Sequence, residues 1–168
     1  MTRPLDALTV PTPVGDLVVL VDDDGAVVAS GFSDLDDVVG RLAPDLAGRG
    51  VRRCAESGGV AAAVRAWLAG DLRALDAVAV RQPGGPFLQQ AWAAMRRIPP
   101  GTTWTYAELA AQAGRPAAVR AAGSACARNL VAPFVPCHRV VRSDGTLGGY
   151  FYGLPAKEWL LRHEGATG

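Results

Sequence analysis

The sequence contains no uninterrupted apolar run of the roughly 18 residues that a membrane-spanning helix requires. Its first residues lack the charged and then apolar order of a signal peptide, so we expect a cytoplasmic protein with no membrane partner. The three cysteines, Cys54, Cys126 and Cys137, include no closely spaced pair, which argues against a disulfide framework. Because the chain has only two histidines and no Cys-x-x-Cys motif, we expect no metal site. These absences disfavour secreted, membrane and zinc-stabilised proteins.

The sequence does contain enough apolar material for a packed core. Hydrophobic residues make up 49% and charged residues 20% of the 168 residues, a balance that is typical of folded proteins. The length allows one large domain or two small ones.

Charge is unevenly distributed along the chain. Residues 1–80 carry 12 acidic and 7 basic side chains, whereas residues 81–168 carry 4 acidic and 10 basic ones. Nine of those ten are Arg, the side chain best suited to forked contacts with phosphate. This asymmetry predicts that the second half faces a polyanion, with ordinary surface charge as the alternative.

Residues 1–83 are predicted to form a small α/β domain. The Asp-Gly sequence at 24–25 separates two apolar runs and predicts a turn between two strands. Ser33 followed by Asp36 suggests the cap of a short helix. The expected elements are strands at 17–21, 26–29 and 75–80, and helices from 33 to 42 and over 60–68. Because no catalytic cluster occurs here, we expect a structural role.

Residues 84–168 are predicted to form a second, mostly helical domain after a linker rich in Pro and Gly. Thr105 and Glu108 form a capping box, Gly114 suits the end of that helix, and Pro116 suits the first turn of the next one. Two helices joined by such a turn make a helix-turn-helix. The expected helices start at 87, 106, 116 and 156, and the segment 129–136 is expected to be extended.

The helix expected at 116–127 presents a face with almost no side-chain bulk. Arg120, Gly123, Ser124 and Ala127 share this face, and Arg120 is its single long cation. Small residues permit close approach of the backbone to a minor groove, where the Arg could enter the base stack. Packing of the small face against another helix is the alternative.

Cys137 carries the clearest chemical signal, because His138 and Arg139 follow it directly. Cysteine reacts as its thiolate, which neighbouring cations or a base promote. Adjacent side chains point in different directions, so His138 would reach the sulfur through a water. A carboxylate is needed to orient the imidazole, and Glu158 and Glu164 are the candidates. Cys54 and Cys126 fit the description of inert core cysteines.

The sequence Pro-Cys-His-Arg-Val-Val at 136–141 resembles the active-site motif of the O6-alkylguanine-DNA alkyltransferases. Further family segments follow the same order, so the resemblance covers about residues 84–165. These are Phe-Leu-Gln-Gln-Ala-Trp at 87–92, Ile-Pro-Pro-Gly-Thr-Thr-Trp-Thr-Tyr at 98–106, Arg-Ala-Ala-Gly at 120–123, Asn129, and Lys-Glu-Trp-Leu-Leu-Arg-His-Glu-Gly at 157–165. The resemblance implies a ribonuclease-H-like α/β domain followed by a winged-helix domain with the helix-turn-helix.

The resemblance also implies roles for individual residues. Cys137 would accept the alkyl group, His138 would act as its base through a water, and Glu164 would orient His138. Tyr106 would promote base flipping and donate a proton, and Asn129 would brace the turn around Cys137. The implied DNA-binding residues are Arg120 as an intercalating finger, Ala121, Gly123, Ser124, Ala127 and Arg128, and the implied substrate pocket comprises Val140, Tyr150, Phe151 and Tyr152.

The function expected from this resemblance is direct reversal of O6-alkylguanine in double-stranded DNA, once per molecule, without a cofactor. A monomer is expected, while cooperative binding and reaction with O4-alkylthymine are left open. One alternative is a DNA-binding sensor that recognises lesions without repairing them. A cysteine hydrolase is another alternative, although no residue pattern supplies an oxyanion hole.

Overall fold

The computed structural model describes residues 3–166 and divides the chain into two compact units. The first comprises Met1–Gln82 with Leu130–Phe134, and the second comprises Pro83–Asn129 with Val135–Gly168. The chain first passes from one unit to the other between Gln82 and Pro83, next to the expected domain boundary. Leu130–Phe134 was expected in the second domain but belongs to the first unit. No helix among residues 3–166 is long and apolar enough to cross a membrane, and the expected cytoplasmic location stays a prediction.

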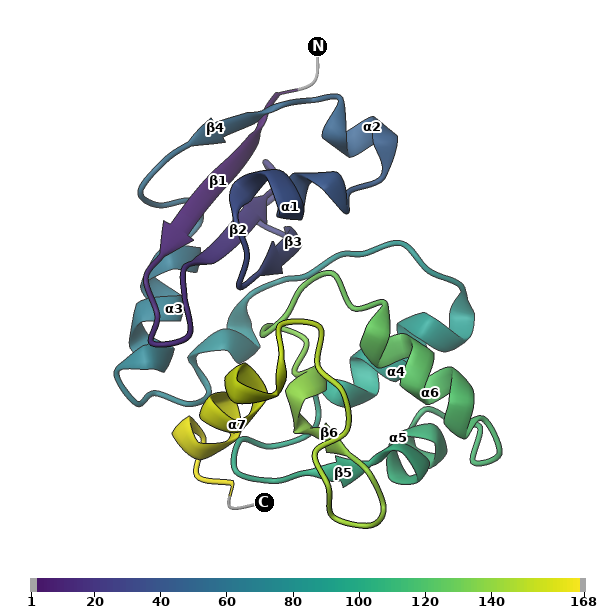
Figure 1. Ribbon diagram of the computed structural model, residues 1–168. Helices are drawn as coiled ribbons and strands as arrows, with labels where there is room; N and C mark the ends of the chain where they lie inside the picture. Colours follow the sequence, from purple (N-terminus) through teal and green to yellow (C-terminus); the bar gives the residue numbers. More distant parts are fainter. Residues whose placement is uncertain (1–2, 167–168) are drawn as a thin grey trace. The chain divides into compact units, whose positions relative to one another are not determined.

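The first unit is built on a four-stranded sheet of order β3-β2-β1-β4 (Figure 1). Its strands are β1 (Leu5–Val10), β2 (Leu17–Val21), β3 (Val27–Gly31) and β4 (Val51–Arg53). β1 to β3 pair antiparallel, whereas β4 runs parallel to β1. The strands predicted at 17–21 and 26–29 are confirmed as β2 and β3. β1 and β4 were not predicted, and β4 is only three residues long with two exposed arginines.

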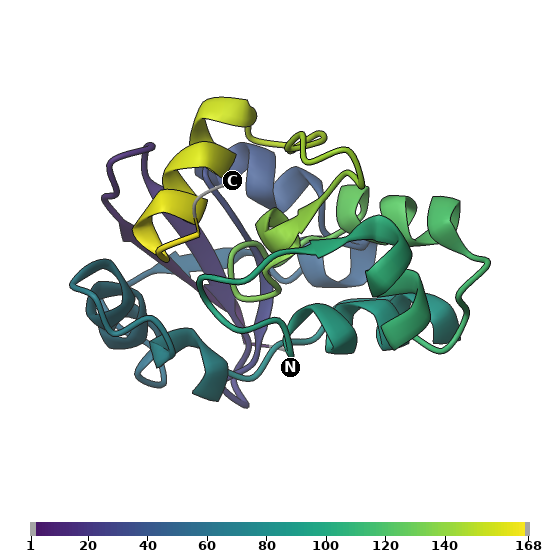
Figure 2. The same ribbon diagram turned by 90° about the horizontal axis from the view of Figure 1, so that it is seen from below.

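Helices cover the sheet of the first unit on both faces. Helices α1 (Leu35–Gly40) and α2 (Pro44–Ala47) pack over an apolar cluster that includes Leu5, Val18 and Leu20. Helix α3 (Val60–Leu68) packs against β1 with Val64 and Trp67 fully buried. Figures 1 and 2 show α3 on the side of the strands opposite α1. The helix predicted at 60–68 is therefore confirmed.

Two local predictions in the first unit are wrong. Asp34, not Ser33, caps α1, because its side chain accepts a hydrogen bond from Asp37 N at 2.8 Å. Ser33 Oγ instead donates to the Asp37 carboxylate at 2.6 Å. The strand expected at 75–80 is the short 3₁₀ helix η1 (Ala74–Ala77), followed by a single bridge between Val80 and Val27. Local turn hydrogen bonds, such as Asp76 N to Arg73 O, outweigh the alternating pattern there.

The second unit is mostly helical. Its helices are α4 (Pro86–Met95), α5 (Tyr106–Gln112), α6 (Val119–Ala127) and α7 (Leu154–His163), with the 3₁₀ helix η2 (Cys137–Arg139) and the short parallel pair β5 (Trp104–Thr105) and β6 (Val140–Val141). Helices α4, α5 and α6 pack together, and Trp92 Nε1 donates to Ala125 O at 2.9 Å. Pro155 lies in the first turn of α7, as expected, and Glu164 is its C-cap.

Helices α5 and α6 form the expected helix-turn-helix. The capping box is present, because Thr105 Oγ1 accepts from Glu108 N and a Glu108 oxygen accepts from Thr105 N, both at 3.1 Å. Gly114 has the left-handed φ of +89° that ends α5. The predicted start of the second helix at Pro116 is wrong, since a turn from Arg115 to Ala118 precedes α6.

The segment from 129 to 136 is not extended as predicted. Within the first unit, Ser30 N donates to Leu130 O at 2.8 Å, and Val131 forms a bridge with Ser30. Residues 132–134 then form a turn, so only one residue of the segment pairs with a strand. The next residues of the chain are the second unit's Val135 and Pro136, which lead directly to Cys137.

Candidate active site

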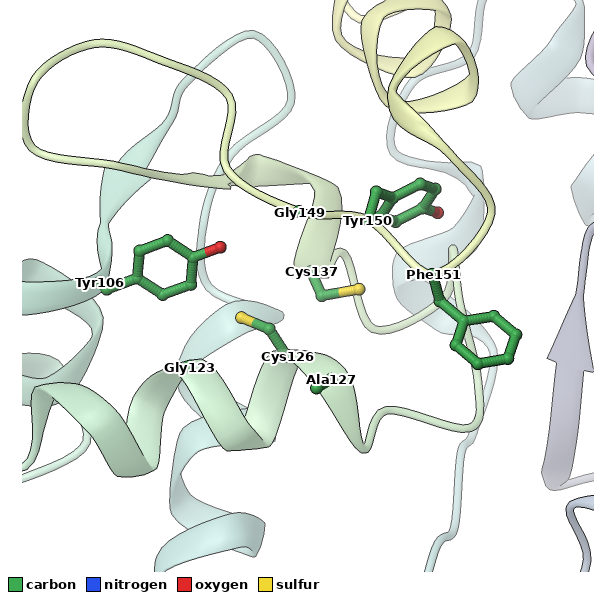
Figure 3. A pocket seen from close by; sticks show the side chains of 8 residues that line it. All are labelled: Tyr106, Gly123, Cys126, Ala127, Cys137, Gly149, Tyr150 and Phe151. Atoms are coloured by element: carbon green, nitrogen blue, oxygen red, sulfur yellow. The ribbon is translucent and has the colours of Figure 1, made fainter.

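Cys137 opens helix η2 and lines a pocket of about 240 Å³ in the second unit. This volume lies below the range of about 300–1,000 Å³ that is usual for drug-sized ligands. The pocket is lined by Tyr106, Gly123, Cys126, Ala127, Cys137, Gly149, Tyr150 and Phe151. Figure 3 shows Tyr106 on one side of the two thiols and Tyr150 and Phe151 on the other. The cavity therefore offers a small ligand one largely buried sulfur nucleophile.

A buried imidazole and carboxylate lie next to the nucleophile. His138 is fully buried, and its Nε2 lies 2.8 Å from Glu164 Oε1. Burial by itself would raise the pKa of Glu164, but His138 and Arg139 hold this pKa well below its usual value. Glu164 is therefore an ionised acceptor. Glu158, the other candidate, is exposed and pairs with Arg162 at 3.6 Å, so it is excluded as the orienting group.

The protonation of His138 follows from this pairing. Burial lowers its pKa more than the Glu164 carboxylate raises it, so the ring is neutral at pH 7. Because the carboxylate only accepts, Nε2 carries the proton and Nδ1 carries the lone pair. Nδ1 is buried and has no hydrogen-bond partner among residues 3–166. The lone pair that a general base requires is thus available.

Arg139 holds Glu164 from a second direction, which the sequence did not reveal. Its Nε donates to Glu164 Oε1 at 2.9 Å and its Nη2 to Oε2 at 2.7 Å. A further guanidinium nitrogen donates to the carbonyl of Ile98. Such a two-point contact fixes the plane of the carboxylate. Arg139 follows Cys137 by two positions in the sequence, and this closeness was the only signal.

Lys157 is, after Arg139, a second charged residue whose role the sequence did not indicate, although it begins the segment 157–165. It is fully buried, and its ammonium donates to the carbonyls of Val140 (2.8 Å), Leu147 and Gly149 (3.2 Å). Burial lowers the pKa of Lys157. These bonds tie α7 to β6 and to the loop that follows it, whose Gly149 lines the pocket.

Asn129 lies where a brace was expected. It is buried, and its Nδ2 donates to Val135 O at 2.8 Å. This hydrogen bond joins the two residues that flank Leu130–Phe134. One of them, Val135, lies two positions before Cys137. Leu130 N is satisfied separately by Gln82 Oε1 at 2.8 Å.

Tyr106 starts α5, and its hydroxyl points into the pocket (Figure 3). Burial, followed by the charges of Cys126 and Cys137, raises its pKa, so the hydroxyl stays protonated. Gly148 has a φ of +74°, and a Cβ at this position would lie 2.8 Å from Tyr106 Oη. Glycine is therefore required for the loop to pass this close to the hydroxyl.

Cys126 corrects a prediction, since it lines the same pocket as Cys137 and is not an isolated core residue. Burial, followed by the charge of Cys137, raises its pKa strongly, so Cys126 stays a thiol. Cys126 lies on α6 next to Ala125, which is buried together with Ala122. At this position helical spacing alone does not tell whether a residue belongs to the core or to the pocket.

The outer face of α6 agrees with the spacing in the sequence. Arg120, Ser124 and Ala127 are exposed, as is Arg128 after the helix, whereas Ala122 and Ala125 are buried. A Cβ at Gly123 would meet nothing within 4 Å, so packing within the protein does not require this glycine. The face is therefore open, and packing against another helix of the second unit is excluded for it. Ala121 is half-buried and lies beside this face.

The four residues expected in the pocket separate into two pairs. Tyr150 and Phe151 line it, and Phe151 is 66% exposed. Val140 is fully buried and Tyr152 packs edge-on against both other aromatic rings, with centroids at 5.6 Å and 5.0 Å. Neither Val140 nor Tyr152 lines the pocket, so their contact with a substrate stays a prediction.

The second unit combines a helix-turn-helix with a small pocket that contains a cysteine nucleophile. Comparisons with known proteins show which protein family has this combination. The model of the 6-O-methylguanine DNA methyltransferase, DNA binding domain, matches residues 86–166. The methylated-DNA–protein-cysteine methyltransferase of Salmonella typhimurium is 38% identical over 159 residues, which covers 93% of each chain. The chain therefore belongs to the 6-O-methylguanine DNA methyltransferase family.

Solved structures agree with this assignment. The Mycobacterium tuberculosis O6-methylguanine methyltransferase is 31% identical, with a TM-score of 0.76, and covers 96% of this chain and 93% of its own. The structure of Mycobacterium tuberculosis OGT in complex with DNA is 29% identical, with a TM-score of 0.77, over 95% and 92%. The mixed sheet-and-helix fold of the chain is thus that of the family.

Proposed function

We propose that this protein repairs DNA by direct reversal, moving an alkyl group, mainly methyl, from O6 of guanine to Cys137. The observation that carries this proposal is the thiol of Cys137 in a pocket beside the buried His138–Glu164 pair. The family supports it, since the relatives are named methylated-DNA–protein-cysteine methyltransferases and one neighbouring structure is a complex with DNA.

The reaction is an in-line displacement. The Cys137 thiol first gives its proton, through a water, to Nδ1 of His138, and Glu164 stabilises the imidazolium. The thiolate then attacks the alkyl carbon, the carbon–O6 bond breaks, and its electron pair stays with the guanine. Tyr106 supplies a proton to the departing base, for which a protonated hydroxyl pointing into the pocket is suited, and it regains a proton from the His138 imidazolium through solvent. The thioether is stable, so each molecule reacts once.

The DNA contacts belong to the outer face of α6. In our proposal Arg120 fills the space of the flipped guanine, because it is exposed while small residues surround it. Gly123, Ser124, Ala127 and Ala121 let the backbone approach the minor groove, and Arg128 contacts phosphate. We also propose that the first unit is ribonuclease-H-like and structural, and that the second is a winged-helix domain. Binding as a monomer stays a prediction.

The test is mass analysis of the intact protein and its peptides after mixing with a duplex that contains one O6-methylguanine. We expect one methyl per protein, on the peptide that contains Cys137. The Cys137→Ser variant should gain none and still bind the duplex, whereas Cys126→Ser, at the same pocket, should gain one. Transfer to another cysteine would overturn the assignment. Binding without any transfer would identify a lesion sensor instead.

A further inference from the structure

Two buried polar side-chain atoms have no hydrogen-bond partner among residues 3–166: Nδ1 of His138 and the hydroxyl oxygen of Tyr150. Buried polar atoms in native proteins are nearly always satisfied by protein or by ordered water. Both exceptions lie beside the same nucleophile, since His138 follows Cys137 and Tyr150 lines its pocket. Their common location calls for one explanation.

Tyr150 is placed by the loop between β6 and α7, which the buried Lys157 ties down at Leu147 and Gly149. Figure 3 shows its ring beside Cys137, on the side to which the Cys137 sulfur points. The side chain as a whole is half-buried, but its hydroxyl is buried. Burial, followed by the charges of Cys137, Tyr152 and Glu164, raises the pKa of Tyr150 well above its usual value. The hydroxyl is therefore a proton-bearing donor near the thiol.

We propose that Tyr150 is a positioning residue for the alkyl transfer: its hydroxyl and Nδ1 of His138 together hold the water that accepts the proton of Cys137. This inference rests on the proposed function and adds a third protein group to the proton path. A buried water typically makes about three hydrogen bonds, which these two atoms and the sulfur supply. Ring contacts alone do not account for a buried hydroxyl.

The proton balance is simple. The Cys137 S–H bond breaks, its proton passes to the water oxygen, and another proton of that water passes to Nδ1 of His138. The products are a thiolate, an unchanged water and an imidazolium paired with Glu164. Tyr150 keeps its proton and donates a hydrogen bond to the water oxygen, which fixes the orientation of the water. No electrons are gained or lost.

The test is Tyr150→Phe, because this change removes only the hydroxyl and keeps the ring that packs edge-on against Tyr152 at 5.6 Å. Ser143→Ala is the matched control, since it removes an exposed hydroxyl of the same loop that does not line the pocket. Both are made in a background with Cys54→Ser and Cys126→Ser, so that Cys137 is the one remaining thiol. Of the other groups that interact electrostatically with Cys137, Tyr106 and Lys157 are unchanged, and Cys126→Ser is common to both variants.

Two quantities are measured: the rate of methyl transfer from the O6-methylguanine duplex, and the ultraviolet absorbance of the thiolate as a function of pH. We expect Tyr150→Phe to slow transfer about tenfold at neutral pH, as the loss of one hydrogen bond to a charged system does. Its thiolate absorbance should appear at higher pH, because the water that solvates the charge has lost a donor. Ser143→Ala should change neither.

Equal rates and equal titrations for the two variants would overturn the inference. A slower rate with an unchanged titration would also overturn it, since the hydroxyl would then act on the substrate. Duplex binding in a Cys137→Ser background must be the same with Tyr150 and with Phe at this position, which shows that the variant is folded. If the unsubstituted protein transfers no methyl, the proposed function fails, whereas the titration still tests the water.

Discussion

The two units of the protein handle charge differently. In the first unit, Asp22 is itself buried and accepts hydrogen bonds from Arg49 at 2.9 Å and from Arg81, but Arg81 and its second partner Asp24 are at least half exposed. In the second unit, the side chains of His138 and Glu164 are at most 1% exposed. The first arrangement keeps contact with solvent, and the second has almost none.

This difference separates the ion pairs of the first unit, which cost little to keep, from the buried pair of the second unit, which the site needs. A pair that reaches solvent costs little desolvation and contributes little, whereas a buried pair costs several kcal/mol and is rarely the most stable choice. Apolar residues in place of a buried ion pair are often as stabilising or more so, so stability alone does not explain Glu164 and Arg139. The buried cluster is therefore explained by the chemistry of Cys137, and the comparison can be tested by breaking one arrangement at a time.

The largest effect is expected from Glu164→Gln. The change leaves Arg139 buried without its counter-charge, so the free energy of unfolding should fall by about 3–5 kcal/mol. Methyl transfer should slow as well, because the imidazolium of His138 loses its partner. Urea unfolding and transfer rates measure both. Glu158→Gln on the same helix is the control, because its exposed pair with Arg162 at 3.6 Å should contribute little. Similar losses in both variants would refute the comparison.

A smaller effect is expected from Arg120→Ala, which tests the basic second unit as the DNA-binding part. Without a residue to fill the gap, the flipped state should cost about 1–3 kcal/mol more, which slows duplex repair roughly ten- to hundredfold. Reaction with the free base O6-methylguanine should keep its rate, since nothing is flipped. Arg73→Ala removes an exposed arginine of the first unit and serves as control. Equal slowing of the duplex and free-base reactions would exclude the finger role.

The next effect is a dependence of stability on pH, for which the two units are expected to differ. The pKa of His138 is lowered by burial, so below about pH 6.5 the unfolded chain binds a proton that the folded chain does not. Stability should therefore fall as the pH drops below about 6.5, with a limiting slope of about 1.4 kcal/mol for each pH unit. The carboxylates of the first unit, whose pKa values are lowered from 3.8, lose their contribution only at more acidic pH.

Chemical unfolding at pH 7 and pH 5 measures this fall. His138→Asn should remove it, whereas replacement of the second histidine, His163→Gln, should retain it. A fall that persists in His138→Asn would assign it to another group.

The smallest effect is expected from Asp24→Asn in the first unit. Arg81 loses one charged acceptor but keeps Asp22, and both Arg81 and Asp24 are at least half exposed, so unfolding should become easier by about 1 kcal/mol or less. The rate of methyl transfer by the folded protein should not change. A loss as large as that of Glu164→Gln would show that solvent contact does not separate the two clusters.

The sequence predicted the features whose causes are local. The capping box of Thr105 and Glu108, the turn before β3 and helix α3 each depend on residues close together in the chain. β1 was missed because Asp6 and Thr9 interrupt its apolar residues, although its antiparallel partner β2 follows it directly, and β4 was missed because it is very short. At the site, the residues themselves indicated His138 and resemblance chose Glu164 over Glu158, but no spacing showed that Lys157 is buried or that Cys126 lines the pocket.

The return of Leu130–Phe134 to the first unit has a consequence for biosynthesis. Ser30 Oγ donates to Ala132 O across 102 positions of the chain, so the first unit is completed only after α4, α5 and α6 have been synthesised. Contacts of such long range slow folding, and domains otherwise tend to fold in the order of synthesis. Cys137 follows three residues after Phe134. The nascent chain therefore acquires its reactive thiol only when the last segment of its first unit has been made.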